Sequence, residues 1–270
     1  MSRLIKIAFT IVFLTVLIAC FGYKIFSSKS SVVSKSMGMK KFFNVVLFGA
    51  AGSGKGTQGD IIKGKMNLLQ VSAGEVLRQY RKNPNAKYTK VINDYIDKGQ
   101  LVPSEITNEL IAEHIRNNVF CDGCVYDGVI YDGFPRQVGQ LEFLDNFLKD
   151  NGNKVDAVVY IDVPMEDLVD RLSGRFACSD CGELYHKKTK PTKVSGVCDK
   201  CGSTRFSVRA DDQDVNAIKE RFKIFLETTM PVLNVYNSRG IVIKVDGTRS
   251  PKEIGDEILV KLGKIKKSQQ

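Results

Sequence analysis

The chain has 270 residues, of which 43% are hydrophobic, and this length and composition allow one large α/β domain with inserted subdomains. Of the formal net charge of +10, most lies in residues 1–41, which contain seven basic residues and no acidic one, leaving 33 basic and 30 acidic residues in the rest. This balance excludes the overall positive surplus typical of nucleic-acid-binding proteins, so we expect no nucleic-acid partner.

The first element is an uncharged run over residues 7–23, close to the ~20 apolar residues that span a bilayer. Three interpretations fit it: a membrane anchor, a signal peptide cleaved near Cys20, or an extension before a true start at Met37 or Met39. The lysines that follow the run favour a body that stays in the cytoplasm. We therefore expect residues 1–38 to be a hydrophobic segment with its tether, making membrane contact through the run if the anchor interpretation holds.

Beyond this segment, apolar β-branched runs alternate with helical patterns. The runs expected to form strands are residues 42–48, 68–71, 129–131, 157–161 and 241–245. One helix is expected to begin near Lys55. Further helical patterns cover residues 105–117, 140–149, 165–172, 215–225 and 251–262. This alternation predicts a parallel sheet with helices on both faces and ligands at the carboxyl ends of the strands. A solvated C-terminal tail is expected to contain Lys261, Lys264, Lys266 and Lys267.

A glycine-rich turn follows the first predicted strand. Gly49, Gly54 and Lys55 have the P-loop spacing G-x-x-x-x-G-K, with a strand before the turn and a helix after it. The glycines allow consecutive backbone N–H groups to point into one cavity, and the helix dipole adds attraction for phosphate. We expect Lys55 to reach the β- and γ-phosphates of a nucleotide. The motif indicates nucleotide binding without selecting a reaction.

Two C-x-x-C pairs separated by 16 residues are formed by Cys178, Cys181, Cys198 and Cys201. Each pair can place two sulfurs on one metal ion, and four sulfurs complete the closed tetrahedral site typical of structural Zn²⁺. Two disulfides are the alternative, which a reducing cytoplasm disfavours. A third pair, Cys121 and Cys124, lacks a second pair, so we expect thiols without a metal or redox role.

Four further motifs occur in a fixed order along the chain. GKGTQ begins at Gly54, DGFPR at Asp132, R-x-x-G-R at Arg171 and R-x-D-D at Arg209. Together they resemble the motifs of the adenylate kinase and nucleoside monophosphate kinase family. Several ordered motifs are far more specific than one P-loop.

The resemblance implies a fold, a domain organisation and a reaction. The implied fold is a three-layer α/β P-loop fold with a five-stranded parallel sheet, forming a kinase domain over residues 39–270. A helical NMP-binding insertion is implied over residues 71–101 and a zinc-containing lid over residues 174–211. The implied reaction is ATP + AMP ⇌ 2 ADP, with Mg²⁺ accompanying ATP, in a protein that is usually a monomer.

The resemblance also implies roles for individual residues. The implied ATP-binding residues are Gly52, Ser53, Gly54, Lys55, Gly56, Thr57, Arg171 and Gly247. The implied AMP-binding residues are Ala73, Arg78, Gly133, Arg136, Gln140 and Arg209. The implied catalytic residues are Lys55, Asp132, Arg136, Arg175, Arg209 and Arg221, with Asp132 ordering the Mg²⁺ waters. Arginine suits these positions because its planar fork binds phosphate oxygens bidentately and stays charged.

Two alternative functions follow from departures in the sequence. Ala73 replaces the usual threonine, and residues 72–78 resemble the UMP/CMP kinase branch, whereas Gln140 matches the glutamine that recognises adenine. We therefore predict AMP as the acceptor and keep a UMP/CMP kinase as the alternative. A nucleic-acid-binding protein with a P-loop and a zinc ribbon is a third hypothesis, because residues 178–205 hold six basic and three acidic residues.

Overall fold

The computed structural model describes residues 41–119 and 123–268. The predicted N-terminal segment, with its uncharged run at 7–23, lies outside the described residues, and so does Cys121. Within the described ranges, no helix combines the length and the apolar character needed to cross a bilayer.

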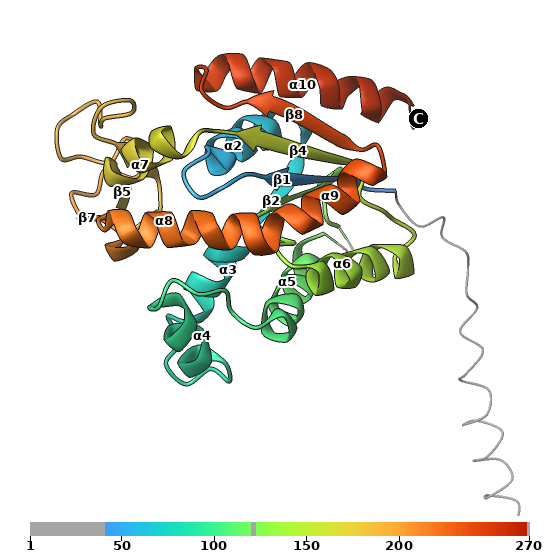
Figure 1. Cartoon of the computed structure of the whole chain (residues 1–270), viewed down its shortest axis with the longest axis horizontal. Coiled ribbons are helices and arrows are strands. Elements are labelled where there is room, and N and C mark those ends of the chain that lie inside the picture. The colour runs from blue at the N-terminus through green and yellow to red at the C-terminus, as the bar shows by residue number, and fades with distance from the viewer. Residues whose placement is uncertain (1–40, 120–122, 269–270) are drawn as a thin grey trace, which may run out of the picture. The chain divides into compact units, whose positions relative to one another are not determined.

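The centre of the fold is a five-stranded, all-parallel sheet with the strand order β2-β3-β1-β4-β8 (Figure 1). The strands are β1 (Phe43–Phe48), β2 (Leu68–Ser72), β3 (Gly128–Asp132), β4 (Ala157–Asp162) and β8 (Val242–Asp246). The predicted sheet is confirmed, and each strand agrees with its predicted range to about one residue. All six residues of β1 are buried, as expected for a central strand covered on both faces.

Helices cover both faces of the sheet, as Figure 1 shows. Those on one face are α2 (Lys55–Met66) and α10 (Pro251–Ser268), and those on the other are α5 (Ser104–Asn118), α6 (Val138–Asp150) and α9 (Met230–Ser238). Alternate residues of β1 point to opposite faces, so Val45 and Leu47 pack with the first group and Val46 and Phe48 with the second. The predicted three-layer α/β fold is thereby confirmed.

Two features of the later helices differ from prediction. α8 (Val215–Ile224) runs through a π-helical turn, η2 (Phe225–Thr229), into α9, and the sequence did not predict this continuation. α10 ends at Ser268, so its last turns contain the lysines that were predicted to form a solvated tail. The prediction of a tail was wrong, because Ile265 packs against the same buried cluster as the rest of α10 and extends the helix, whereas Lys264 and Lys267 are exposed, as predicted.

Two smaller units extend from the sheet (Figure 1). The first consists of α3 (Ala73–Tyr80) and α4 (Thr89–Ile96), which follow β2 and share a small buried cluster with α5. The second follows α7 (Met165–Ser173) and is an antiparallel sheet of order β6-β5-β7, made of β5 (Arg175–Cys178), β6 (Leu184–His186) and β7 (Phe206–Ser207). These elements fall within the predicted insertions, whose boundaries stay predictions.

Candidate active site and metal centre

The carboxyl ends of the strands open into a cleft of about 1080 Å³. Every residue that the sequence analysis assigned to ATP, AMP or catalysis lines this cleft. Its walls come from the loop after β1, from α3, from the loop after β3, from the lid strands and from the β8–α10 connection. The fold therefore brings together, in one cavity, groups that are up to about 200 residues apart in the chain, as expected at the carboxyl edge of a parallel sheet.

The P-loop owes its shape to glycines in the left-handed region. Gly49 has φ 147°, Gly52 has φ 86° and Gly54 has φ 97°. A Cβ at Gly49 would lie 2.4 Å from the Oγ of Ser53, so this turn has no room for a side chain. The resulting loop curls around the amino terminus of α2, where unpaired backbone N–H groups favour an anion.

Lys55 lies at the first position of α2 and bends back over the loop. Its Nζ donates hydrogen bonds to the backbone oxygens of Gly49 at 2.7 Å and Ala50 at 2.8 Å. The pKa of Lys55 is lowered to about 8, chiefly by burial; Asp132 opposes this change and nearby arginines contribute to it. The cleft is thus a place where positive charge accumulates without enough carboxylates to balance it.

On the side of the cleft next to β3, Arg136 is held by two backbone contacts. Its Nε donates to the oxygen of Gly133 at 2.9 Å, and its backbone N–H donates to Oε1 of Gln140 at 2.8 Å. Burial lowers the pKa of Arg136. Gln140 is 3% exposed, and its side-chain nitrogen, Nε2, makes no hydrogen bond to any described residue. Arg78, from α3, pairs with Glu75 at 3.0 Å at the rim.

On the lid side, one carboxylate organises two arginines. Asp212 is fully buried and accepts two hydrogen bonds from Arg175, at 2.7 and 2.8 Å. It also accepts one from Arg221 at 2.8 Å, and Asp211 pairs with Arg221 at 2.9 Å. Arg209 makes no ion pair with any described residue, and burial together with neighbouring arginines lowers its pKa to about 10.

Several lining residues were not singled out from the sequence. They are Gln100, Leu101 and Val102 of the α4–α5 connection, and Tyr185, His186 and Lys190 of the lid. Asp212, which is buried behind the wall and supports the lid arginines, was not singled out either. The R-x-D-D motif contained Asp212, but nothing in the sequence showed that its carboxylate would be buried between two arginines. The others lie in the α4–α5 connection and in or next to β6, where the sequence carries no local motif.

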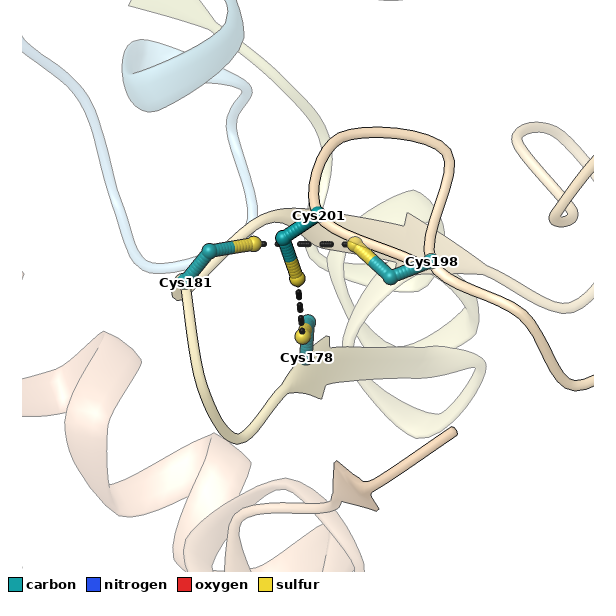
Figure 2. Close-up of side chains that lie close together, drawn as sticks. All are labelled: Cys178, Cys181, Cys198 and Cys201. Carbon is teal, nitrogen blue, oxygen red and sulfur yellow. Dashed lines mark hydrogen bonds between the residues drawn. The ribbon is translucent and has the colours of Figure 1, made fainter. Parts of the chain in front are cut away.

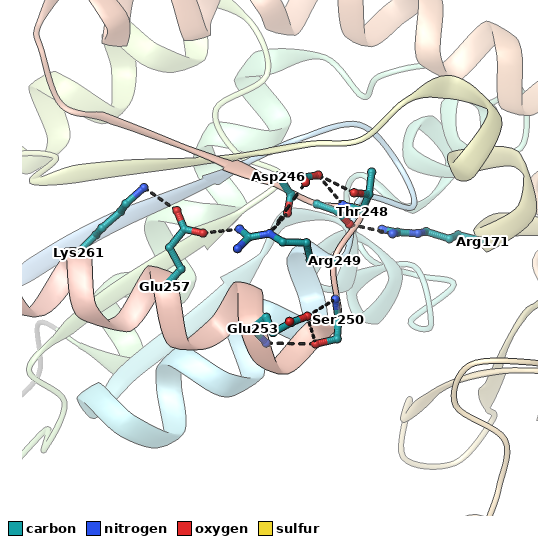
Figure 3. Close-up of polar contacts among 9 residues, drawn as sticks. Arg171, Asp246, Thr248, Arg249, Ser250, Glu253, Glu257 and Lys261 are labelled. Carbon is teal, nitrogen blue, oxygen red and sulfur yellow. Dashed lines mark hydrogen bonds and ion pairs between the residues drawn. The ribbon is translucent and has the colours of Figure 1, made fainter.

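The loop between β8 and α10 lines the cleft, and Figure 3 shows its polar contacts. Arg171 donates to the backbone oxygen of Gly247 at 2.8 Å, and this contact joins α7 to the loop. Asp246 accepts from the backbone N–H and the hydroxyl of Thr248, and these bonds lower its pKa. Arg249 pairs with Glu257 of α10. The loop is therefore fixed from both sides, next to the position predicted for the ATP base.

The four lid cysteines form one cluster (Figure 2). Their sulfur atoms all lie within 4.8 Å of one another, with Cys178–Cys201 at 3.6 Å and Cys181–Cys198 at 3.5 Å. Four sulfurs at about 2.3 Å from one zinc ion are about 3.8 Å apart, so the cluster fits a tetrahedral site. All four are free thiols in the structure rather than the two disulfides of the alternative interpretation.

Two tight turns present these sulfurs. The N–H of Gly182 donates to the oxygen of Cys178 at 3.0 Å, and that of Gly202 donates to the oxygen of Cys198 at 2.9 Å. Both glycines have φ 74°, the left-handed conformation that such turns require. His186 turns its Nδ1 to the N–H groups of Lys188 and Thr189, both at 3.1 Å, in agreement with a site of four sulfurs.

The parallel sheet, the P-loop and the cleft lined by cations define a protein of the P-loop phosphotransferase class. Comparison with known proteins sharpens this result. The family model for adenylate kinase matches residues 47–241. The chain is 38% identical over 214 residues to the adenylate kinase of Caldanaerobacter subterraneus subsp. tengcongensis, covering 79% of this chain and 93% of that protein. It is 38% identical over 220 residues to that of Lactococcus lactis subsp. lactis, covering 82% and 100%. The chain belongs to the adenylate kinase family.

Proposed function

We propose that the chain transfers the terminal phosphoryl group of ATP to AMP, giving two ADP, and that the cleft is where this occurs. ATP:AMP phosphotransfer is the activity of the family to which the chain belongs. The site assignment rests on the convergence of Lys55, Asp132 and the four arginines predicted to be catalytic on one cavity. Two nucleotides bring many negative charges together, and phosphoryl transfer depends on positioning and on neutralising that charge.

The donor nucleotide occupies the side of the cleft formed by the P-loop. Backbone N–H groups of residues 52–57 hold the phosphates, and Lys55 exchanges its contacts with the loop carbonyls for phosphate oxygens. The base lies between Arg171 and the fixed loop at Gly247. Mg²⁺ bound with ATP supplies further charge neutralisation, and Asp132 is the carboxylate in the cleft suited to ordering its waters.

The acceptor nucleotide occupies the side between α3 and β3, where Ala73 and Gly133 line the wall. Arg78 and Arg136 bind its phosphate, and Arg209 is free to reach the same group. Gln140 is held through its oxygen, which leaves its amide N–H groups to donate to a base. An adenine ring offers an acceptor nitrogen to such a donor, and the family resemblance assigns Gln140 to adenine, which supports AMP as the acceptor.

The lid supplies Arg175 and, through Asp212, aligns it with Arg221 over the transferring group. We propose that Cys178, Cys181, Cys198 and Cys201 hold one structural Zn²⁺, which has no open coordination position and so takes no part in the chemistry. The lid excludes water from the cleft, so that ATP is not simply hydrolysed. We further propose that the protein acts in the cytoplasm as a monomer and contacts the membrane through residues 7–23.

A coupled assay of the full chain with ATP and each of AMP, CMP, UMP and GMP tests the proposal. We expect AMP to give the highest kcat/KM. Gln140→Glu keeps the size of the side chain but removes the amide donor, so it should raise KM for AMP about tenfold or more with a smaller effect on kcat. Faster turnover of CMP than of AMP would favour the UMP/CMP kinase instead. Absence of transfer together with salt-sensitive RNA binding would favour the nucleic-acid-binding protein.

A further inference from the structure

The edge of the sheet opposite to the cleft carries a cluster of lysines. α2 and α10 both start at the carboxyl ends of the strands and end at the amino ends, where the described chain also begins (Figure 1). The basic edge, as we call this surface, consists of Lys41, Lys63, Lys65, Lys264, Lys266 and Lys267.

Direct contacts bring these segments together around Asp127. Lys266 of α10 lies 3.5 Å from Oδ2 of Asp127. The backbone oxygen of Asp127 accepts from the N–H of Phe43, at the start of β1, at 2.9 Å. The N–H of Asp127 donates to the oxygen of Asn67, which follows α2, at 2.9 Å. The ends of both helices and the entry of the chain into the body therefore share one surface.

Most of the charge on this surface is not neutralised by the protein. Lys63 pairs with Asp60 and Lys266 pairs with Asp127. The other four, which are all exposed and make no ion pair with any described residue, are Lys41, Lys65, Lys264 and Lys267. The helix dipole favours lysine near a helix C-terminus, but it leaves the surface with four uncompensated positive charges.

We propose that the basic edge docks on a membrane surface rich in anionic lipids. The inference rests on the proposed membrane contact of residues 7–23. The 17 residues from 24 to 40 can span at most about 60 Å, so an inserted run keeps the body near the bilayer. The described chain begins at Lys41, within the basic edge, so residues 24–40 are covalently joined to the body at this surface.

Docking in this way leaves the active site accessible. Strands of five or six residues, about 17–20 Å long, separate the basic edge from the cleft at their carboxyl ends. In this docked arrangement the cleft faces away from the bilayer. Nucleotides can therefore enter and leave it from the solvent. The basic edge contributes no residue to the cleft, so changes there should leave phosphotransfer unchanged.

Vesicle binding of the body, residues 39–270, tests the proposal. This part folds on its own, because its relatives are matched over 93% to 100% of their own length by 214 to 220 residues of this chain. We expect it to co-sediment with vesicles of phosphatidylglycerol and phosphatidylcholine at low salt, and to be released at 0.5 M salt. Each lysine near an anionic surface is worth roughly fivefold in partitioning, so Lys65→Gln, Lys264→Gln and Lys267→Gln together should weaken binding about a hundredfold.

A matched variant of the lid controls for net charge. Lys187, Lys188 and Lys193 are equally exposed and unpaired among the described residues, so their combined change to Gln should leave vesicle binding within about threefold. Equal loss in both triple variants, equal binding to vesicles of phosphatidylcholine alone, or binding of RNA but not of vesicles would overturn the proposal.

Two further measurements test separately the membrane contact of residues 7–23, on which docking rests, and the proposed reaction. Alkaline extraction of membranes containing the full chain tests the membrane segment: retention supports it, and release rejects the premise of docking even where the isolated body binds. The coupled assay with AMP tests the reaction, and both triple variants should retain the kcat of the parent. Loss of activity in the variant of the basic edge alone would contradict its separation from the cleft.

Discussion

The P-loop and the lid both present cations to the phosphates, but they are stabilised in different ways. The P-loop follows β1, whose six residues are all buried between two layers of helices. In the lid, the buried cluster consists of Cys178, Tyr185 and Cys198, with partly buried side chains around them. Hydrophobic burial therefore fixes one half of the site, whereas the other half depends on its sulfur cluster and on ion pairs.

The aromatic residues of the lid show how little burial it achieves. The rings of Phe176 and Tyr185 stack at 5.5 Å, and Phe206 meets both edge-on at 5.4 and 5.8 Å. Among the described residues, these three side chains and three of the cysteines form the apolar centre of a unit of about 38 residues, too small a core to fold without a further crosslink. A bound metal would provide that crosslink, since its binding free energy adds to folding.

The largest expected effect comes from removing a cation of the rigid half. Arg136→Ala should lower kcat about a thousandfold or more, because Arg136 is proposed to bind the AMP phosphate that attacks the transferring group and to neutralise charge there in the transition state. The sheet should stay folded, so the thermal midpoint should change little. Arg136→Lys keeps the charge but loses the planar fork, and should recover only part of the rate. A loss below tenfold in steady-state kinetics would remove Arg136 from the catalytic assignment.

Removing metal should affect only the other half. We expect the purified chain to hold about one zinc per molecule by mass spectrometry. Chelation, or Cys178→Ser with Cys198→Ser, should lower kcat about a hundredfold and make residues 174–211 sensitive to protease. The affinity of the P-loop for ATP should change by less than about threefold.

Re-addition of zinc after chelation is the control, and it should restore both activity and protease resistance. Absence of metal in protein produced with zinc available would contradict the zinc site. Global unfolding on chelation would contradict the expectation that the metal stabilises only the lid.

A smaller effect on kcat is expected from changing Asp212, the buried carboxylate that binds the lid arginines. Asp212→Asn keeps the shape but removes the charge that holds Arg175 and Arg221, so kcat should fall about tenfold, with about 3 kcal/mol lost from the free energy of unfolding. Asp211→Asn is the matched control, because Asp211 is more exposed and pairs with Arg221 alone. It should lose less than about 1 kcal/mol. If the two variants lost equal amounts of kcat and of unfolding free energy, the burial of Asp212 would not be the cause of its effect.

The two halves also differ in how far the sequence predicted them. Strand positions were predicted to about one residue, because buried parallel strands are continuous apolar runs and Lys55 follows a local glycine motif. The support given by Asp212 could not be predicted, because its partner Arg175 is 37 residues away and burial is a property of the fold. The turn η2 was missed for a related reason, since tertiary packing rather than local pattern continues α8 into α9.

The smallest effect concerns protons in the rigid half. The pKa of Lys55 is lowered to about 8, chiefly by burial, with Asp132 opposing this change and nearby arginines contributing to it. Lys55 is therefore charged below pH 8 and loses its proton as the pH rises through 8. Since ATP needs that charge, kcat/KM for ATP should fall several-fold between pH 8 and 9.

Bound phosphates favour the protonated amine, so kcat should hold to a higher pH than kcat/KM does. Lys55→Arg is the control, because a guanidinium stays charged and should remove the inflection near pH 8. Between pH 8 and the ordinary lysine value of 10.5, the unfolded chain binds this proton and the folded chain does not. The contribution of Lys55 to the free energy of unfolding should therefore increase with pH in that window, in the opposite direction to its effect on ATP binding. Parallel loss of kcat and kcat/KM, or a flat kcat/KM up to pH 9.5, would show that the cleft does not hold Lys55 in this state.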